Sequence, residues 1–434
     1  MTMSNRSSGN SFNSRAFRVV LIFLVLGTHI GLIWSVVTQT PSVIWPLHHD
    51  TVYGMGRGED FNAIYHAAVN VQRDQSPYRK NQDGITSYFQ AFRYLPIVAI
   101  AAQGILFLSP RAAYLVWVAI LEIMLALLIY GFYKRIQKPL VRDIASLLLL
   151  LNSPYLLEVH MGQFTFATIA LCALSLLFSA GPLPYVIAVL FKVFPLVIIP
   201  AFVRYRKYWV HVILAIFFLI VLSAPYFVQN PSTWTIFFQR NFLLSGGLGS
   251  GNYGLVQFLY LTGNDLALGL FITNWDILVN SFRLILFIVV AFIVVLSRKD
   301  NPILGACTLL LTHFVTYQHV WEHHMSGVLV IAALLLVVWA DQAELTAIGL
   351  LSMFLLALPT PFALFDITRS PALLDPAINW PRYASYMIVL PKVIPVLVLF
   401  LLCVFDLCKE GLESPLRVIA NIGHFSSSGY LKAS

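Results

Sequence analysis

Charged residues are scarce in this sequence. Asp, Glu, Lys and Arg make up 11% of its 434 residues, and 59% of the residues are hydrophobic. A soluble domain has about 25% charged and about 45–50% apolar residues. So few charges cannot cover a water-facing surface, which excludes a soluble enzyme. Apolar stretches of membrane-spanning length recur from Arg18 to Leu407 with no soluble block between them. The composition therefore predicts a polytopic membrane protein.

Cysteine and acidic residues are also few. The four cysteines lie in or at the ends of apolar segments without metal-ligand spacing, which argues against a disulfide framework or a zinc site: Cys172, Cys307, Cys403 and Cys408. The net charge of +8 comes from small basic clusters between apolar runs. A nucleic-acid partner would need a basic face or stripe. The excess of Lys and Arg therefore indicates membrane orientation.

The apolar runs predict an all-α membrane protein with about twelve crossings. The run from Val19 to Val37 is too long for a signal-peptide core, so it is expected to be an uncleaved first helix. Tyr94 to Ser109 is short and flanked by prolines, and counting it as a span would put the basic cluster around Lys134 outside, so we expect a surface helix there. The other predicted spans are Ala112–Tyr133, Ile144–Glu158, Phe164–Phe178, two half-spans within Leu183–Val203, Trp209–Val228, Ile277–Leu296, Pro302–Thr316, Met325–Trp339, Glu344–Leu358 and Ser385–Leu407.

This topology predicts one membrane domain over residues 1–434, multi-pass in the cell membrane, with both termini in the cytoplasm. Its parts are a cytoplasmic tail (1–17), a first extracytoplasmic loop with juxtamembrane helices (40–111), the helices and loops of 112–407, and a cytoplasmic C-terminal tail (408–434). The long polar segments and two short turns then face outward, whereas the cytoplasmic loops are short and basic. Any chemistry is therefore expected on the outer side.

The first outer loop contains an acidic pair, Glu59 and Asp60, that opens a helix-like run after Gly58. Apolar residues follow at i, i+3 and i+4 spacing, including Tyr65, which suits a helix lying flat on the bilayer. A carboxylate held at the lipid boundary can take a proton from a sugar hydroxyl. Acids are also ordinary at helix N-termini, so Asp60 and Glu59 have a purely structural alternative.

Basic and polar groups lie at other predicted outer positions. Arg93 could pair with a phosphate at the membrane surface or act as a headgroup-level anchor. The turn from Glu158 to Phe164 includes Gln163, which could serve function or cap the turn. Lys192 interrupts an apolar hairpin, where it could bind a lipid phosphate or extend its amino group to water. The Gly-rich segment from Gly246 lacks the Lys-Ser/Thr of a P-loop and is expected to be a loop.

The densest polar cluster runs from Tyr317 to Met325 and includes His319, Trp321, Glu322, His323 and His324. The arrangement of His319, Glu322, His323 and His324 lacks the His-Glu-x-x-His spacing that places two metal ligands on one helix face, so no metal ligand is predicted. Sugar and phosphate binding suits an indole face and imidazole donors better. An interfacial aromatic belt is the structural alternative.

Taken in order, these motifs resemble glycosyltransferase family 87, the DUF2029 group of GT-C-type membrane enzymes, which includes phosphatidylinositol-mannoside mannosyltransferases. The matching residues are Asp60-Phe61 with Tyr65 and Ala67-Ala68, Pro77-Tyr78, Phe92-Arg93-Tyr94-Leu95-Pro96, Gly162-Gln163, Lys192 with Pro195 before the basic run from Arg204, and Trp321-Glu-His323-His324. The resemblance implies a GT-C fold with surface helices in the first outer loop and a polyprenyl-phosphate sugar as donor. It also implies an acidic catalytic base there, which maps onto Asp60.

From the residues and the resemblance together we expect a hexosyltransferase that moves mannose or another hexose to a lipid or glycan acceptor on the extracytoplasmic face, with inversion. Asp60 is the expected base. The donor phosphate is assigned to Lys192, Arg93, His323 and His324, and the sugar or acceptor to Glu59, Tyr65, Gln163, Trp321, His319 and Glu322. No cofactor is expected, although a divalent cation stays open. The partners are membrane lipids, donor and acceptor. A transporter or lipid flippase is the alternative, because Lys192 sits at a helix break.

Overall fold

The computed structural model describes residues 9–38, 57–79, 91–178, 181–242, 252–266, 274–360, 382–415 and 418, and within these ranges the chain is helical apart from turns and two isolated bridges. The Gly-rich segment 246–251, most of the first outer loop before Arg57 and nearly all of the C-terminal tail lie outside the described residues. Predictions for those segments stay predictions.

Six helical segments are long and apolar enough to cross a membrane. They are α1 (Gly9–Thr38, of which Val19–Thr38 qualifies), α5 (Pro110–Arg135), the pair α6 (Pro139–Leu150) and α7 (Ser153–Met161), α11 (Arg206–Gln229), α15 (Trp275–Leu296) and α20 (Arg382–Cys408). The chain is therefore a multi-pass, all-helical membrane protein. The predicted spans coincide with these helices to within a few residues, except that α6 begins five residues before Ile144.

Shorter helices fill the rest of the described chain. They are α3 (Glu59–Gln72), α4 (Pro96–Ala102), η1 (Gln103–Ile105), α8 (Thr165–Phe178), α9 (Leu183–Phe191), η2 (Phe194–Ile198), α10 (Ile199–Val203), α12 (Pro231–Phe242), α13 (Leu255–Asp265), α16 (Pro302–Thr316), α17 (His324–Trp339) and α18 (Ala343–Ala357). Five of the shorter apolar segments coincide with predicted crossings or half-crossings. The count of about twelve stays a prediction. The segment Tyr94–Ser109 holds helices too short to span, as expected.

Two helix breaks shape the bundle. The chain leaves the helix at Lys192, which has extended φ and ψ angles of −140° and 132°, and Pro195 then opens η2. This is the predicted break. The second break, between α6 and α7, was not predicted. There Asn152 accepts a hydrogen bond from the Tyr155 amide at 2.6 Å and Pro154 stands in the first turn, which is a helix-start signal.

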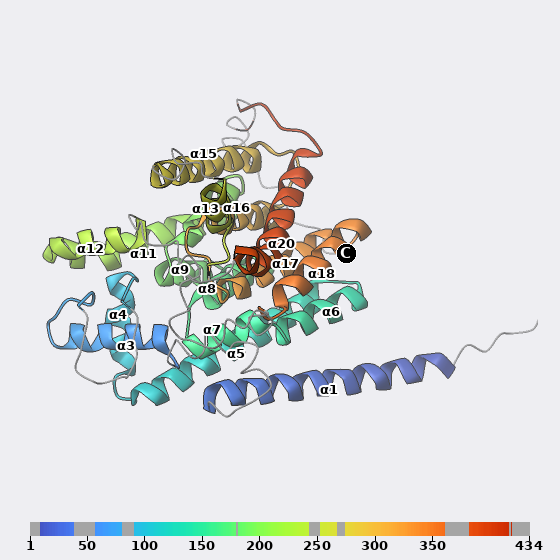
Figure 1. The fold of residues 1–434 in the computed structure, drawn as a ribbon, viewed down its shortest axis with the longest axis horizontal. Coiled ribbons are helices and arrows are strands. Elements are labelled where there is room, and N and C mark those ends of the chain that lie inside the picture. The colour runs from blue at the N-terminus through green and yellow to red at the C-terminus, as the bar shows by residue number, and fades with distance from the viewer. Residues whose placement is uncertain are drawn as a thin grey trace, which may run out of the picture.

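The core lies along α8 and α17, whose side chains are buried along nearly their whole lengths. These two helices pack on each other, and α5, α9 and α18 pack around them. In contrast α1, α11 and α15 expose most of their apolar side chains, as lipid-facing helices do. Figure 1 shows α1 and α15 along opposite sides of the bundle, with α3, α4 and α12 gathered at one end.

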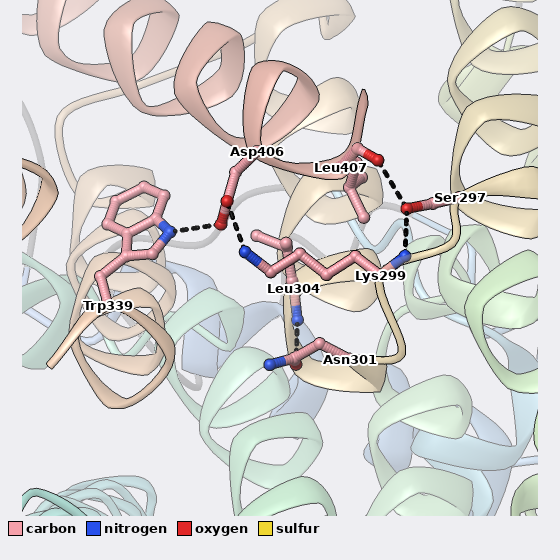
Figure 2. A network of polar contacts seen from close by, with 7 residues as sticks. All are labelled: Ser297, Lys299, Asn301, Leu304, Trp339, Asp406 and Leu407. Carbon is pink, nitrogen blue, oxygen red and sulfur yellow. Dashed lines mark hydrogen bonds and ion pairs between the residues drawn. The ribbon is translucent and has the colours of Figure 1, made fainter. Parts of the chain in front are cut away.

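A polar network ties α15, α16, α17 and α20 together at the other end of α17 from His324 (Figure 2). Asp406 on α20 accepts a hydrogen bond from the indole of Trp339 at 3.0 Å and pairs with the ammonium of Lys299. The hydroxyl of Ser297 donates to the Leu407 carbonyl at 2.6 Å. Asp406 is buried, so this ion pair stabilises the junction of α15, α16, α17 and α20 only while both partners are present.

Candidate functional site

The start of α3 is docked onto the end of α7. The Gly58 amide donates to the His160 carbonyl at 2.7 Å, and the Tyr114 hydroxyl donates to the Val159 carbonyl at 2.8 Å. Gly162 ends α7 with a left-handed φ of 65°, and an added Cβ there would lie 2.6 Å from the Cβ of Phe61. This close approach places Asp60, the second residue of α3, beside Gln163.

Asp60 is half-buried, and its Oδ2 is buried without a hydrogen-bond partner among the described residues. Burial raises the pKa of Asp60 to about 6, although the charges of Lys192 and Arg93 and a hydrogen bond from Gln163 oppose that rise. The carboxyl is therefore mostly ionised at neutral pH and can still take up a proton. An unpartnered carboxylate oxygen with such a pKa is suited to general-base chemistry.

The helix break aims Lys192 into the same place. Its ammonium donates to Thr165 Oγ1 at 2.7 Å and to Gln163 Oε1 at 3.2 Å. Gln163 Oε1 also accepts from the Phe164 amide, so its NH₂ group is the part that faces Asp60. Gln163 thus bridges Asp60 and Lys192 by hydrogen bonds. Its position in a turn does not by itself predict this bridge.

Glu158 is a second carboxylate in this cluster. It is fully buried, and it accepts hydrogen bonds from the Phe166 amide at 2.7 Å and from the Ser326 hydroxyl at 3.1 Å. The charges of Glu158 and Asp60 both act on Lys192. The sequence had placed Glu158 in a polar turn without a role. Its partner Ser326 is 168 residues away, so no local pattern could have revealed its burial.

Arg93 reaches the cluster from the non-helical segment before α4. Its guanidinium is exposed, and its charge lowers the pKa of Asp60 and of His319. Helix α12, which lies beside this segment in Figure 1, holds the backbone in place. Arg240 donates to the Phe92 carbonyl at 2.8 Å, and Asn241 donates to the Arg93 carbonyl at 2.9 Å.

Four histidines between residues 313 and 324 add aromatic rings and hydrogen-bonding nitrogens to the cluster. The ring of His313 stacks on Phe194 at 4.6 Å and on Tyr317 at 4.9 Å, and the rings of His323 and His324 lie 4.2 Å apart. Burial, helped by the charge of Lys192, holds the pKa of His323 well below its usual range. Burial, with Arg93 and Arg283, lowers the pKa of His319 to about 4. These imidazoles are therefore neutral hydrogen-bonding groups at neutral pH.

Arg283 is a cation that the sequence reasoning missed. It lies inside the predicted span Ile277–Leu296, and its charge reaches His319, His313 and Tyr317. No ion pair of Arg283 occurs within the described ranges. An arginine within an apolar span is itself a signal, because such a charge is costly in lipid.

Several residues with a predicted sugar- or acceptor-binding role lie in structural contacts, and their binding role stays a prediction. The Tyr65 hydroxyl donates to the Leu108 carbonyl at 2.9 Å, and Glu322 Oε1 accepts from the Thr360 amide at 3.2 Å. Trp321 is half-buried, and its amide donates to His324 Nδ1 at 2.9 Å. Glu59 is buried in the first turn of α3. Helix α3 is buried on most faces beneath α4 and η1, which differs from the flat, half-exposed helix that its spacing suggested.

The cluster thus combines two carboxylates with Lys192, Arg93 and Arg283. A cluster with more cations than carboxylates suits an anionic ligand such as a phosphate. In the described part of the chain no group of three His, Cys, Asp or Glu side chains is arranged to hold a metal ion.

Comparison with known proteins identifies the family of this chain. A search of curated proteins gives no significant match. The family model described as glycosyltransferase family 87 matches residues 92–317, just over half of the chain. The matched range includes Arg93, Gln163 and Lys192, whereas Asp60 and His323 flank it. The chain belongs to glycosyltransferase family 87 and is a membrane glycosyltransferase.

Proposed function

We propose that this glycosyltransferase moves one hexose, most simply mannose, from a polyprenyl-phosphate sugar to a hydroxyl of a lipid or glycan acceptor on the extracytoplasmic face of the cell membrane. The observation that carries the proposal is that Oδ2 of Asp60 has no hydrogen-bond partner among the described residues and lies in the positive field of Lys192 and Arg93. Asp60 would act as the base for the acceptor, and the two cations beside it would stabilise the departing phosphate. This proposal needs no cofactor.

In the proposed step, Asp60 takes the proton of the acceptor hydroxyl as that oxygen forms a bond to the anomeric carbon. The bond between the anomeric carbon and the phosphate oxygen breaks on the opposite side, and the polyprenyl phosphate leaves with the electron pair. One in-line displacement inverts the anomeric configuration. With a pKa of about 6, Asp60 can hold the proton and release it afterwards to water.

The departing phosphate needs the larger electrostatic stabilisation. Lys192 and Arg93 are its proposed partners, and Arg283 adds a third cation from α15. His323 and His324 would donate hydrogen bonds as neutral imidazoles. The phosphate would replace the hydrogen bonds that Lys192 now makes to Gln163 and Thr165.

The sugar and acceptor are assigned less directly. Gln163 and His319 lie in the cluster and can bind hydroxyl groups, and Trp321 can offer an indole face. Glu59, Tyr65 and Glu322 keep their proposed sugar or acceptor role only if substrate binding releases them from their present packing. A divalent cation remains open as an assistant for the leaving phosphate.

The donor is tested with purified protein in proteoliposomes and radiolabelled polyprenyl-phosphate mannose. We expect consumption of the donor, label in a glycosylated acceptor and inversion at the anomeric carbon, measured by NMR of the product. Polyprenyl-phosphate glucose is the matched donor that tests whether the enzyme prefers mannose. Movement of labelled lipid across the bilayer without donor consumption would favour the flippase alternative and contradict the proposal.

A further inference from the structure

A polar triad lies within the membrane-spanning bundle, apart from the candidate site. His29 on α1 contacts Glu122 on α5 at 2.8 Å from Nε2 to Oε2, and its Nδ1 lies 2.7 Å from the Leu150 carbonyl. The Tyr155 hydroxyl on α7 donates to Glu122 Oε1 at 2.8 Å. The rings of His29 and Tyr155 also stack, with centroids 6.1 Å apart.

Hydrogen-bond counting fixes the proton content of this triad. The Leu150 carbonyl is only an acceptor, so His29 Nδ1 must carry a proton. His29 Nε2 then either donates to an ionised Glu122 or accepts from a protonated one. In both states the pair shares one proton and has no net charge. Glu122 is about 18 Å along α5 from Pro110, so neutrality removes most of the cost of its place in the bilayer.

His29 of the triad satisfies a backbone carbonyl that lacks its helical donor at the break between α6 and α7. In a continuous helix the Leu150 carbonyl would accept from the amide of residue 154, but that residue is Pro154 and has no N–H. His29 supplies the missing donor. The break therefore depends on α1 and α5 for its hydrogen bonds, and Tyr155 fixes the first turn of α7 to the same carboxyl.

The other end of α7 carries the candidate site. Glu158 follows Tyr155 by three residues on the same helical face, and Gly162 and Gln163 end the helix. The His160 carbonyl anchors Gly58, and with it Asp60. We propose that His29, Glu122 and Tyr155 lock this nine-residue helix in position and thereby set the place of Glu158, Gln163 and Asp60 relative to Lys192. They are positioning residues. The effect on transfer rests on the proposed function, whereas the lock itself does not.

Two substitutions of Glu122 test the triad, because one can keep its hydrogen bonds and the other cannot. Glu122→Gln can keep all three hydrogen bonds, because neutral His29 accepts from the new amide and Tyr155 donates to its oxygen. Glu122→Leu removes the two hydrogen bonds that Glu122 makes, and Tyr155→Phe removes one. Tyr130→Phe on α5 is the matched control, because Tyr130 is exposed. All variants are made in the full chain and reconstituted in nanodiscs.

Hydrogen exchange measured by mass spectrometry tests the lock without any substrate. We expect Tyr155→Phe, which removes one hydrogen bond, to speed exchange about fivefold in residues 153–163 and in the first turn of α3, and Glu122→Leu, which removes two, to speed it about thirtyfold. Exchange in α20 should not change. Glu122→Gln and Tyr130→Phe should match the parent protein. Equal acceleration in all helices, or none in α7, would overturn the proposal.

Transfer kinetics give the second readout. A displaced α7 should raise KM for the donor about three- to tenfold and move the pH midpoint of transfer, because Lys192, Arg93 and Gln163 would no longer face Asp60 as they do now. A loss of folded protein alone would lower kcat and leave KM and the midpoint unchanged. If Glu122→Gln abolishes transfer while its exchange stays normal, the ionisable carboxyl of Glu122 is needed for transfer, and the effect of the triad on transfer does not come from positioning α7. If the parent protein shows no transfer, the exchange data still decide the lock.

Discussion

Asp60 is governed by two opposing effects. Burial favours its protonated form, whereas Lys192, Arg93 and Gln163 favour the carboxylate, and the balance leaves a pKa of about 6. Because only the carboxylate can accept the acceptor's proton, kcat/KM should rise with pH and level off above a midpoint near 6. A pH series in proteoliposomes measures this midpoint.

The same balance predicts the effect of Lys192. Lys192→Met removes a cation that lowers the pKa of Asp60, so the midpoint should move to higher pH, and the KM for donor should increase. Lys207→Met, at an exposed lysine on α11, is the matched control and should leave both unchanged. A midpoint that stays in place, or falls, in the Lys192 variant would show that the titrating group is not Asp60.

The sequence predicted a helix break correctly where the residues themselves are unusual in an apolar helix. Lys192 and Pro195 interrupt an apolar run, and the break lies there. It failed where the decisive partner is distant: Glu158 is buried against Ser326, and the Tyr65 hydroxyl is bound to Leu108. Polar groups in a turn can be recognised locally, but the direction in which each side chain points depends on helices far along the chain.

The contact between α7 and α3 is the junction on which the site depends. Gly162→Ala would strain a left-handed φ, which costs about 1–2 kcal/mol, and would also press the new methyl group against Phe61 Cβ at 2.6 Å. That atom is close to the backbone and cannot swing aside, so α3 must shift. We expect a loss of transfer activity of about tenfold or more.

Gly181→Ala provides the control for backbone strain. Gly181 also has a positive φ, of 75°, but nothing lies within 4 Å of an added Cβ. This variant should lose a similar amount of stability and keep its activity per folded molecule. Equal activities of the two variants would mean that the junction does not position Asp60.

The helices themselves were predictable to different degrees. Long apolar runs gave α1, α5, α11, α15 and α20, because hydropathy dominates where a segment must face lipid. Helices α12 and α13 fell in a segment expected to be an outer loop. Their mixed polarity gives no spanning signal, and their packing is set by tertiary contacts such as Arg240 with the Phe92 carbonyl. The α6–α7 break was signalled by Asn152 and Pro154, but the surrounding apolar residues concealed it.

The bundle separates its chemistry from its structural anchoring. The candidate site surrounds the start of α17, and the Asp406 network holds the end of that helix, about 22 Å away along its axis (Figure 2). Asp406→Asn would leave Lys299, whose side chain is 18% exposed, without its partner. We expect a loss of about 3 kcal/mol in stability and little change in transfer per folded molecule.

Thermal denaturation in detergent, combined with transfer assays below the melting temperature, checks this separation. Glu410→Gln is the matched control, because Glu410 is exposed at the end of the same helix. Its melting temperature should match that of the parent protein. If Asp406→Asn changes the KM for donor without lowering the melting temperature, the network is coupled to the site and does not act as a distant anchor.

The central claim is that the Asp60 carboxylate takes the proton of the acceptor, and one pair of variants tests it most directly. Asp60→Asn removes the base with almost no change in shape. Asp74→Asn makes the same change just past the end of α3, at an exposed residue whose left-handed φ of 56° asparagine accepts equally well. With labelled polyprenyl-phosphate sugar, Asp60→Asn should lose at least 99% of transfer while Asp74→Asn retains it. Full transfer by folded Asp60→Asn would contradict the account.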